Sequence, residues 1–199
     1  MHEVAHGVFS WSRHSERLGY ELNGFWWGED GAVVVVDPPE LTGAARAHME
    51  EHGTPTLIVV TNHSHWRATD EVREWSDATV AMSAVDAEAV DGEVGSILAD
   101  GDEVPGGWRV IGMPGKTPGE IGLHREEEEG IALVGDSLIG DPPGELRLLP
   151  VEKIADRAQL ITSLSRLASL DFERLLVGDG EPLLHDADRR VRRFVGELT

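Results

Sequence analysis

The sequence predicts one layered domain of the α/β or α+β class that spans residues 1–199. Continuous apolar runs at residues 32–36, 57–60 and 175–177 have the length and composition of strands buried on both faces. Amphipathic segments with helical periodicity lie between these runs, as in layered α/β folds. There is neither an internal repeat nor a low-complexity linker, and 199 residues suit a single domain with a substantial core.

The first part of the chain predicts strands and one helix. Residues 1–10 are expected to form a short strand. Residues 22–27 and 32–36 are expected to form two more strands, joined by a turn at 28–31. Residues 42–53 predict a helix, because the segment begins with a threonine suited to an N-cap and ends with a glycine.

The middle of the chain continues the alternation. The buried strand at residues 57–60 is followed by a helix at 69–75, a strand at 79–82 and a helix near Asp86. Residues 98–102 and 106–111 are then expected to form two strands joined by a turn.

The last part of the chain predicts a hairpin, a helix, a strand and a final helix. Residues 121–124 and 131–134 are expected to pair across an acidic turn whose consecutive glutamates are solvated. After a loop rich in Pro and Gly, residues 154–167 place their apolar side chains on one face of a long helix. The buried strand at 175–177 precedes a basic helix at 186–198.

Composition excludes several classes of function. The net charge of −20 disfavours binding to nucleic acids and to anionic membranes, which need a cationic surface. The absence of cysteine excludes disulfides, thiolate metal sites and a cysteine nucleophile. No apolar run has membrane-spanning length and the N-terminus lacks a secretory pattern, so we expect a cytoplasmic protein with a small-molecule ligand. The sequence leaves open whether the chain forms a homodimer.

Polar residues of the types found in metal and catalytic sites follow four predicted strands. His63 and His65 follow residues 57–60, and Lys116, Asp136 and Asp179 each follow a later strand. Such loops at strand ends commonly carry functional groups. A His-x-His pair in an extended segment can chelate one metal, and the alternative is that both histidines are hydrogen-bonding loop residues.

The order and spacing of these segments resemble the metallo-β-lactamase superfamily across nearly the whole chain. Residues 37–38 resemble its first acidic turn, and residues 61–68 resemble T-H-x-H-x-D-H. Residues 114–121 resemble P-G-H-T-P-G-S, residues 133–138 resemble F-x-G-D-x-L, and residues 177–182 resemble the closing G-H-G-x-P. The resemblance implies a four-layer αβ/βα sandwich with the site at one edge of two sheets.

The resemblance also implies a set of metal ligands, of which the chain keeps only part. The family's dinuclear site uses five histidines and two aspartates, and His63, His65 and Asp136 match three of them. These three residues could hold a single zinc or iron ion, as two-histidine, one-carboxylate sets do.

Four other ligand positions carry different residues. Arg67 stands at the motif aspartate and Ala68 at the histidine that follows it, while Lys116 and Asp179 replace the remaining histidines. Arginine keeps its charge and cannot bind a metal, so we expect no second metal. We further expect Arg67 and Lys116 to pair with the site's carboxylates and to take the place of the metals, since buried charges are either paired or metal-bound.

Three functions follow from this interpretation. The first is a hydrolase-like pocket with no cofactor that acts on or binds a small anionic or ester-type molecule. His63, His65, Lys116 and Asp136 would then be the catalytic groups. Its substrate-binding residues would be Arg67, Asp179 and Trp66. The alternatives are a mononuclear zinc or iron hydrolase that uses His63, His65 and Asp136, and a non-catalytic binding or structural protein on a retired hydrolase fold. For Trp26 and Trp27, packing in the core is favoured over a wall of the pocket.

Overall fold

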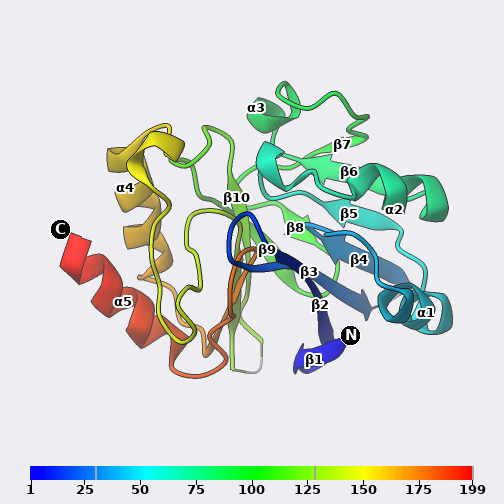
Figure 1. Ribbon diagram of the computed structural model, residues 1–199, viewed down its shortest axis with the longest axis horizontal. Helices are drawn as coiled ribbons and strands as arrows, with labels where there is room; N and C mark the ends of the chain where they lie inside the picture. Colours follow the sequence, from blue (N-terminus) through cyan, green and yellow to red (C-terminus); the bar gives the residue numbers. More distant parts are fainter. Residues whose placement is uncertain (30, 128, 199) are drawn as a thin grey trace.

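The computed structural model describes residues 1–29, 31–127 and 129–198, which form two facing β-sheets with helices on both outer sides (Figure 1). One sheet contains, in spatial order, β1 (His2–Ala5), β2 (Val8–Ser15), β3 (Tyr20–Glu29), β4 (Ala32–Val36), β5 (Leu57–Val59), β6 (Thr79–Met82) and β7 (Ser96–Ile97). The other contains, in spatial order, β12 (Arg174–Val177), β11 (Ile131–Val134), β10 (Ile121–Arg125), β9 (Trp108–Gly112) and β8 (Glu103–Val104). The sequence predicted this sandwich, and the structure confirms it.

The helices complete the outer layers. They are α1 (Gly43–His52), α2 (Thr69–Ser76), α3 (Ala84–Ala87), α4 (Arg157–Leu167) and α5 (Ala187–Leu198), with short 3-10 turns at η1 (His63–His65) and η2 (Val151–Lys153). In Figure 1, α1, α2 and α3 flank the seven-stranded sheet, and α4 and α5 flank the five-stranded sheet. Within the described ranges, no helix is long and apolar enough to cross a membrane.

The main core lies between the two sheets. Phe25, Val36 and Val59 from the larger sheet pack in one buried cluster with Leu123 and Leu133 from the smaller one. Separate apolar clusters attach α1, α2 and the α4–α5 pair to the outer faces of the sheets. The continuous apolar runs of the sequence are therefore the strands that are covered on both sides.

Most of the expected elements are present. The helix at 42–53 begins as predicted, because Thr42 caps it: its hydroxyl oxygen accepts a hydrogen bond from the Ala45 amide at 3.0 Å. The chain leaves this helix at Gly53, whose φ of 147° suits glycine. The helix predicted at 154–167 begins later, at Arg157, because Asp156 caps it through the Gln159 amide at 2.9 Å.

Two strand predictions are wrong in part. Residues 1–10 form two strands rather than one, because the chain turns at Gly7 with a φ of 69° and β2 then runs back along β1. Residues 98–102 form a turn rather than a strand, in which the Asp102 carboxylate accepts a hydrogen bond from the Ala99 amide at 2.8 Å. The predicted turns at 28–31 and 126–130 include Asp30 and Glu128, which lie outside the described residues.

The strand directions bring the polar loops together. β4, β5 and β6 are parallel in one sheet, and β11 and β12 are parallel in the other. The segments after β4, β5, β11 and β12 therefore meet at one edge of the sandwich, as the carboxyl ends of parallel strands do.

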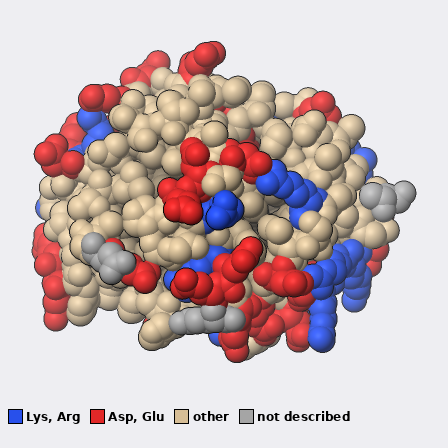
Figure 2. Space-filling view, turned by 180° about the vertical axis from the view of Figure 1, so that it is seen from behind, with Lys and Arg blue, Asp and Glu red and all other residues tan. Residues whose placement is uncertain are grey.

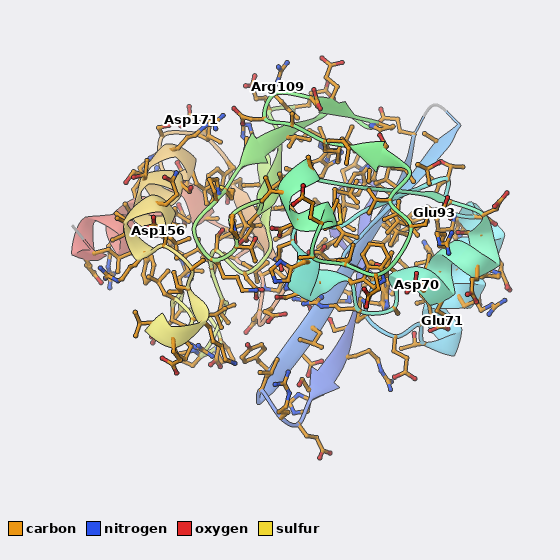
Figure 3. The ribbon with its side chains drawn as sticks, turned by 90° about the horizontal axis from the view of Figure 1, so that it is seen from above. Asp70, Glu71, Glu93, Arg109, Asp156 and Asp171 are labelled. Carbon is orange, nitrogen blue, oxygen red and sulfur yellow. The ribbon has the colours of Figure 1, made fainter. Side chains whose placement is uncertain are left out.

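Charged side chains cover much of the outer surface. Figure 2 shows groups of acidic side chains on the face opposite to that of Figure 1, with fewer basic ones among them. Figure 3 labels six charged residues that are spread over several helices and loops: Asp70, Glu71, Glu93, Arg109, Asp156 and Asp171. This distribution leaves the polar groups at the strand ends as a distinct, largely buried set.

Candidate functional site

The site is centred on His65, which is 2 % exposed and lies in η1 after β5. Its Nδ1 lies 2.7 Å from the carboxylate of Asp37, the residue after β4. Asp37 is fixed in turn by Thr61, whose amide and hydroxyl donate to its two carboxylate oxygens at 2.8 and 2.6 Å. Asp37 adopts a φ of 47°, in the left-handed region, where a short polar side chain that hydrogen-bonds locally is favoured. These contacts set the imidazole with Nε2 directed into the site.

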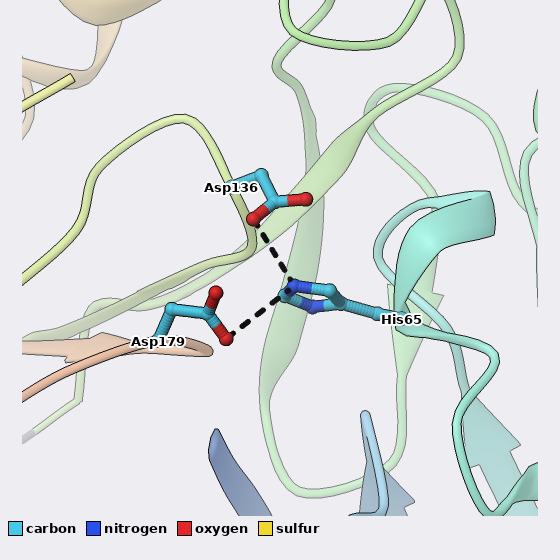
Figure 4. A group of neighbouring side chains, drawn as sticks. All are labelled: His65, Asp136 and Asp179. Carbon is cyan, nitrogen blue, oxygen red and sulfur yellow. Dashed lines mark ion pairs between the residues drawn. The ribbon is translucent and has the colours of Figure 1, made fainter. Parts of the chain in front are cut away.

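The Nε2 of His65 faces two carboxylates from the other sheet (Figure 4). It lies 3.3 Å from Oδ1 of Asp136, which follows β11, and 3.8 Å from Oδ1 of Asp179, which follows β12. Both aspartates are buried. The site therefore joins the two halves of the sandwich, as the order of strand ends in the sequence indicated.

Each of these carboxylates also forms a direct ion pair with a cation. The Lys116 ammonium lies 2.5 Å from Oδ2 of Asp136 and donates to the Ser64 hydroxyl at 2.6 Å. The Arg67 guanidinium lies 2.5 Å from Oδ1 of Asp179. The side chains of Lys116 and Arg67 are only 8 % and 10 % exposed, so solvent screens these pairs weakly.

Arg67 is held by a network beyond its ion pair. Its guanidinium donates to the backbone carbonyls of Asn23, Asp37 and Gly178 at 3.0, 3.3 and 3.3 Å, and one nitrogen lies 3.0 Å from Nε2 of His65. Its backbone has a φ of 42°. This planar cation is therefore fixed against β3 and the segments that follow β4 and β12.

The loop that carries Lys116 and the turn that carries His63 are joined by Asp86, a buried residue of α3. Its carboxylate accepts hydrogen bonds from the His63 amide at 3.0 Å, the Thr117 hydroxyl at 2.7 Å and the Gly119 amide at 3.0 Å. Asp86 was not predicted from the sequence to be part of the site. A carboxylate inside a predicted helix does not by itself indicate that it anchors loops distant in sequence.

The structure places two of the predicted site residues outside the central group. The His63 side chain is 36 % exposed, and its Nδ1 lies 3.5 Å from the Asp86 carboxylate. Trp66 packs in the apolar cluster of β5, β6 and α2, and its indole N–H donates to Asp70 at 2.8 Å. Trp26 and Trp27 are buried in the core, as favoured from the sequence.

Opposing effects act on the pKa of His65. Burial and the Arg67 guanidinium lower it, but the charges of Asp136 and Asp37 outweigh them and raise the pKa to about 10. Burial also raises the pKa of Asp136, yet His65 and Lys116 together hold it well below its usual range. The neighbouring charges therefore favour the protonated form of His65 and the ionised form of Asp136.

Three neighbouring groups have raised pKa values. Burial, followed by the charge of Asp136, raises the pKa of Glu120 to about 8. One Glu120 oxygen accepts hydrogen bonds from Ser137 at 2.8 Å, and the other has no hydrogen-bond partner within the described segments. Burial and Asp179 raise the pKa of Tyr20 to about 12, and burial raises that of Asp179 as well.

The spacing of the possible metal ligands suits a metal ion, but the cations beside them would repel one. His65, Asp136 and Asp179 offer ligand atoms that all lie within 4.8 Å of one another, and their types suit zinc or iron. Metal binding requires a neutral imidazole, however, and each carboxylate already faces a cation. A divalent ion about 4 Å from Arg67 would be repelled by several kcal/mol at an intermediate dielectric.

The site opens into a cavity of about 310 Å³. Its wall includes His65, Arg67, Lys116, Asp136 and Asp179 from the central group. The wall also includes residues that the sequence did not single out: Arg17, Leu18, Tyr20, Leu22, Ser64, Leu149 and Lys153. His63 and Trp66 are not among the described residues that line it.

Comparisons with known proteins agree with the architecture. A family model described as "Metallo-beta-lactamase superfamily" matches residues 3–198. A metallo-beta-lactamase family protein from Thermus thermophilus superimposes with a TM-score of 0.72 at 21 % identity, over 98 % of this chain and 80 % of that one. A beta-lactamase domain protein from Burkholderia ambifaria gives a TM-score of 0.76 at 18 % identity, over 99 % and 76 %. TTHA1623, solved in a di-iron-bound form, gives 0.72 at 21 % identity, over 88 % and 94 %. No curated protein matches the chain.

Proposed function

Since the chain belongs to the metallo-β-lactamase superfamily, we propose that its pocket binds a small anionic or ester-type molecule without a metal. In this proposal, Lys116 and Arg67 supply the positive charge that metals supply in related sites. The observation that carries it is the pair of direct contacts, Lys116 to Asp136 and Arg67 to Asp179, each at 2.5 Å.

Charge balance supports a metal-free site. The central group contains three cations, His65, Lys116 and Arg67, and three carboxylates, Asp37, Asp136 and Asp179. A buried cluster with equal numbers of opposite charges avoids the large cost of an unpaired buried charge. Adding a divalent ion would leave that cluster with excess positive charge.

Protonation favours binding over hydrolysis. A hydrolase needs either a Lewis acid or a group that accepts a proton from water. The carboxylates around His65 favour its protonated form, and His63 contacts Asp86 rather than the cavity. The four groups expected to be catalytic, His63, His65, Lys116 and Asp136, therefore lack an available base in this arrangement.

A second candidate is a hydrolase with one zinc or iron ion. It is favoured by the spacing of His65, Asp136 and Asp179, which offer three ligand atoms of suitable type. This set differs from the one inferred by resemblance, in which His63 took the place of Asp179. The two candidates differ in metal content, in the protonation of His65 and in the position of Lys116.

Metal content separates the two candidates. Tag-free protein with His2→Gln and His6→Gln, which removes adventitious N-terminal ligands, would be purified without chelator, analysed for elements and titrated with zinc in a calorimeter. We expect no stoichiometric metal and no zinc binding in the micromolar range, together with measurable binding of inorganic phosphate. One equivalent of tightly bound zinc or iron, or hydrolysis of simple esters that a chelator abolishes, would refute the metal-free site.

A further inference from the structure

We propose that the ligand of this pocket is a phosphate monoester with a short apolar chain, held at the mouth of the cavity by Arg17 and Lys153. This inference rests on the proposed function and names the class of its ligand. It starts from an unequal distribution of charge: the inner group is balanced, and the outer wall carries two further cations.

The two outer cations are free to bind a ligand. Arg17 and Lys153 are exposed, and within the described ranges neither forms an ion pair with another residue. The inner cations, by contrast, are already engaged by Asp136 and Asp179. Lys116 and Lys153 are the only lysines in a chain of net charge −20, and both line this one cavity.

The fold fixes the backbone next to both outer cations. Arg17 lies in the tight turn between β2 and β3, where the amides of Leu18 and Gly19 donate to the Ser15 carbonyl at 3.1 and 2.7 Å. Lys153 ends η2, and the residues after it are attached to the loop of Lys116. The Ala155 amide donates to the Lys116 carbonyl at 3.1 Å, and the Asp156 amide donates to the Gly115 carbonyl at 2.8 Å.

The charge of the wall selects the ligand's head group. The cavity wall carries four cations, Arg17, Arg67, Lys116 and Lys153, and two carboxylates, Asp136 and Asp179, which gives a net charge of about +2 that a phosphate monoester dianion matches. Arginine donates two hydrogen bonds to one phosphate in a fixed fork, and lysine binds phosphate as a point charge. A monocarboxylate would neutralise only half of this charge.

The remaining wall selects the ligand's tail. Leu18, Leu22 and Leu149 line the same cavity and are each partly buried, so they offer apolar surface beside the cations. Ligand pockets commonly combine such apolar walls with a few placed polar groups. A chain of a few methylene groups that leaves the phosphate at the mouth would contact these leucines.

Calorimetric titrations at low salt test this assignment with four probes: inorganic phosphate, hexyl phosphate, hexanoate and hexanol. We expect hexyl phosphate to bind most tightly, with a gain of about two-fold per methylene along a methyl-to-hexyl series. A fully buried methylene gives a gain of roughly four-fold, and half of that binding free energy corresponds to about two-fold. Hexanoate should bind about ten-fold more weakly than hexyl phosphate, and hexanol should not bind.

Variants locate the head group. Arg17→Gln and Lys153→Gln should each weaken hexyl phosphate binding about three- to ten-fold while leaving the melting temperature unchanged, because both side chains are exposed. Arg13→Gln is the matched control: it lies in β2, on the same hairpin, pairs with Glu40 and does not line the cavity. This control should bind hexyl phosphate as the wild type does.

The outcomes separate this inference from the proposed function. If phosphate binds but both glutamine variants bind it as the wild type does, or if hexanoate equals hexyl phosphate, the assignment of head group and mouth is refuted and an anion-binding pocket stands. If the wild type binds none of the anions, both proposals are refuted.

Discussion

The substitution Lys116→Met tests whether the buried ion pair replaces a metal in stabilising the site. It removes the ammonium 2.5 Å from Asp136 and keeps a flexible apolar side chain of similar length. Both partners are more than nine-tenths buried, so Asp136 would lose a partner that solvent does not replace.

The magnitude follows from burial and from what remains. Breaking a buried pair by removing one partner costs about 3–5 kcal/mol. His65 still contacts Asp136 at 3.3 Å, so we expect the lower end, a loss of about 3 kcal/mol in the free energy of unfolding. Combining Lys116→Met with Asp136→Asn should recover about half of that loss, because the uncompensated charge is then absent.

Urea denaturation followed by tryptophan fluorescence measures these losses. Arg166→Met is the matched control, because Arg166 pairs with Asp100 while both side chains are about half exposed. This control should cost less than about 1 kcal/mol. A loss below about 1 kcal/mol for Lys116→Met, or additive effects in the double variant, would refute the reasoning that a buried pair stabilises this site.

Three further predictions concern the loops and the pH dependence. Asp86→Ala should lower the free energy of unfolding by about 3 kcal/mol in urea denaturation and should weaken phosphate binding. The reason is the loss of three hydrogen bonds that join the His63 and Lys116 loops. An unchanged affinity for phosphate would contradict this prediction. Gly115→Ala should prevent folding or lower the free energy of unfolding by more than about 3 kcal/mol in the same assay, because its φ is 148° and a Cβ there would collide with the Leu160 backbone. The control variant Gly196→Ala, which has open space around it, should have little effect. The free energy of unfolding should fall as pH rises from about 6.5 to 10. The pKa of His65 is about 10 in the folded state and about 6.5 in the unfolded state, so the folded state binds an extra proton between these values. The stabilisation from this proton is complete below about pH 6.5 and is lost as pH approaches 10. Thermal unfolding across this pH range checks the sign, and a melting temperature that rises over it would contradict the assignment.

Much of the fold could be predicted because its signals are local. Buried strands such as residues 32–36 are continuous apolar runs, and the α1 helix carries its own N-cap at Thr42. The polar half of β2 was not predicted, because its residues alternate without an apolar face and owe their strand conformation to pairing with β3. The same limit applies to residues 98–102, where a local turn outweighs a weak apolar pattern.

The site was predictable in part for a different reason. The order of strand ends brings together His65, Asp136 and Asp179, and the two cations were expected to pair with the carboxylates. Side-chain direction was not predictable, because it depends on contacts between distant segments. His63, two residues before the central histidine, turns toward Asp86 for that reason.

The outer part of the pocket lacked a motif. Arg17 and Lys153 come from a turn and a short 3-10 segment that carry no recognisable spacing. The sequence carried one signal, and only for Lys153: the chain contains just two lysines, and Lys153 is the second.

The two buried ion pairs affect how this site could be changed into a metal site by substitution. A histidine in place of Lys116 alone would leave Asp136 without its ammonium while Arg67 still opposed a metal. Changing Arg67 alone would leave Asp179 with only the more distant His65 imidazole, at 3.8 Å, as a partner. Each single substitution therefore leaves a buried carboxylate less well compensated than it is in the present arrangement. Conversion of this site into a metal site therefore requires substitutions at Lys116 and Arg67 together.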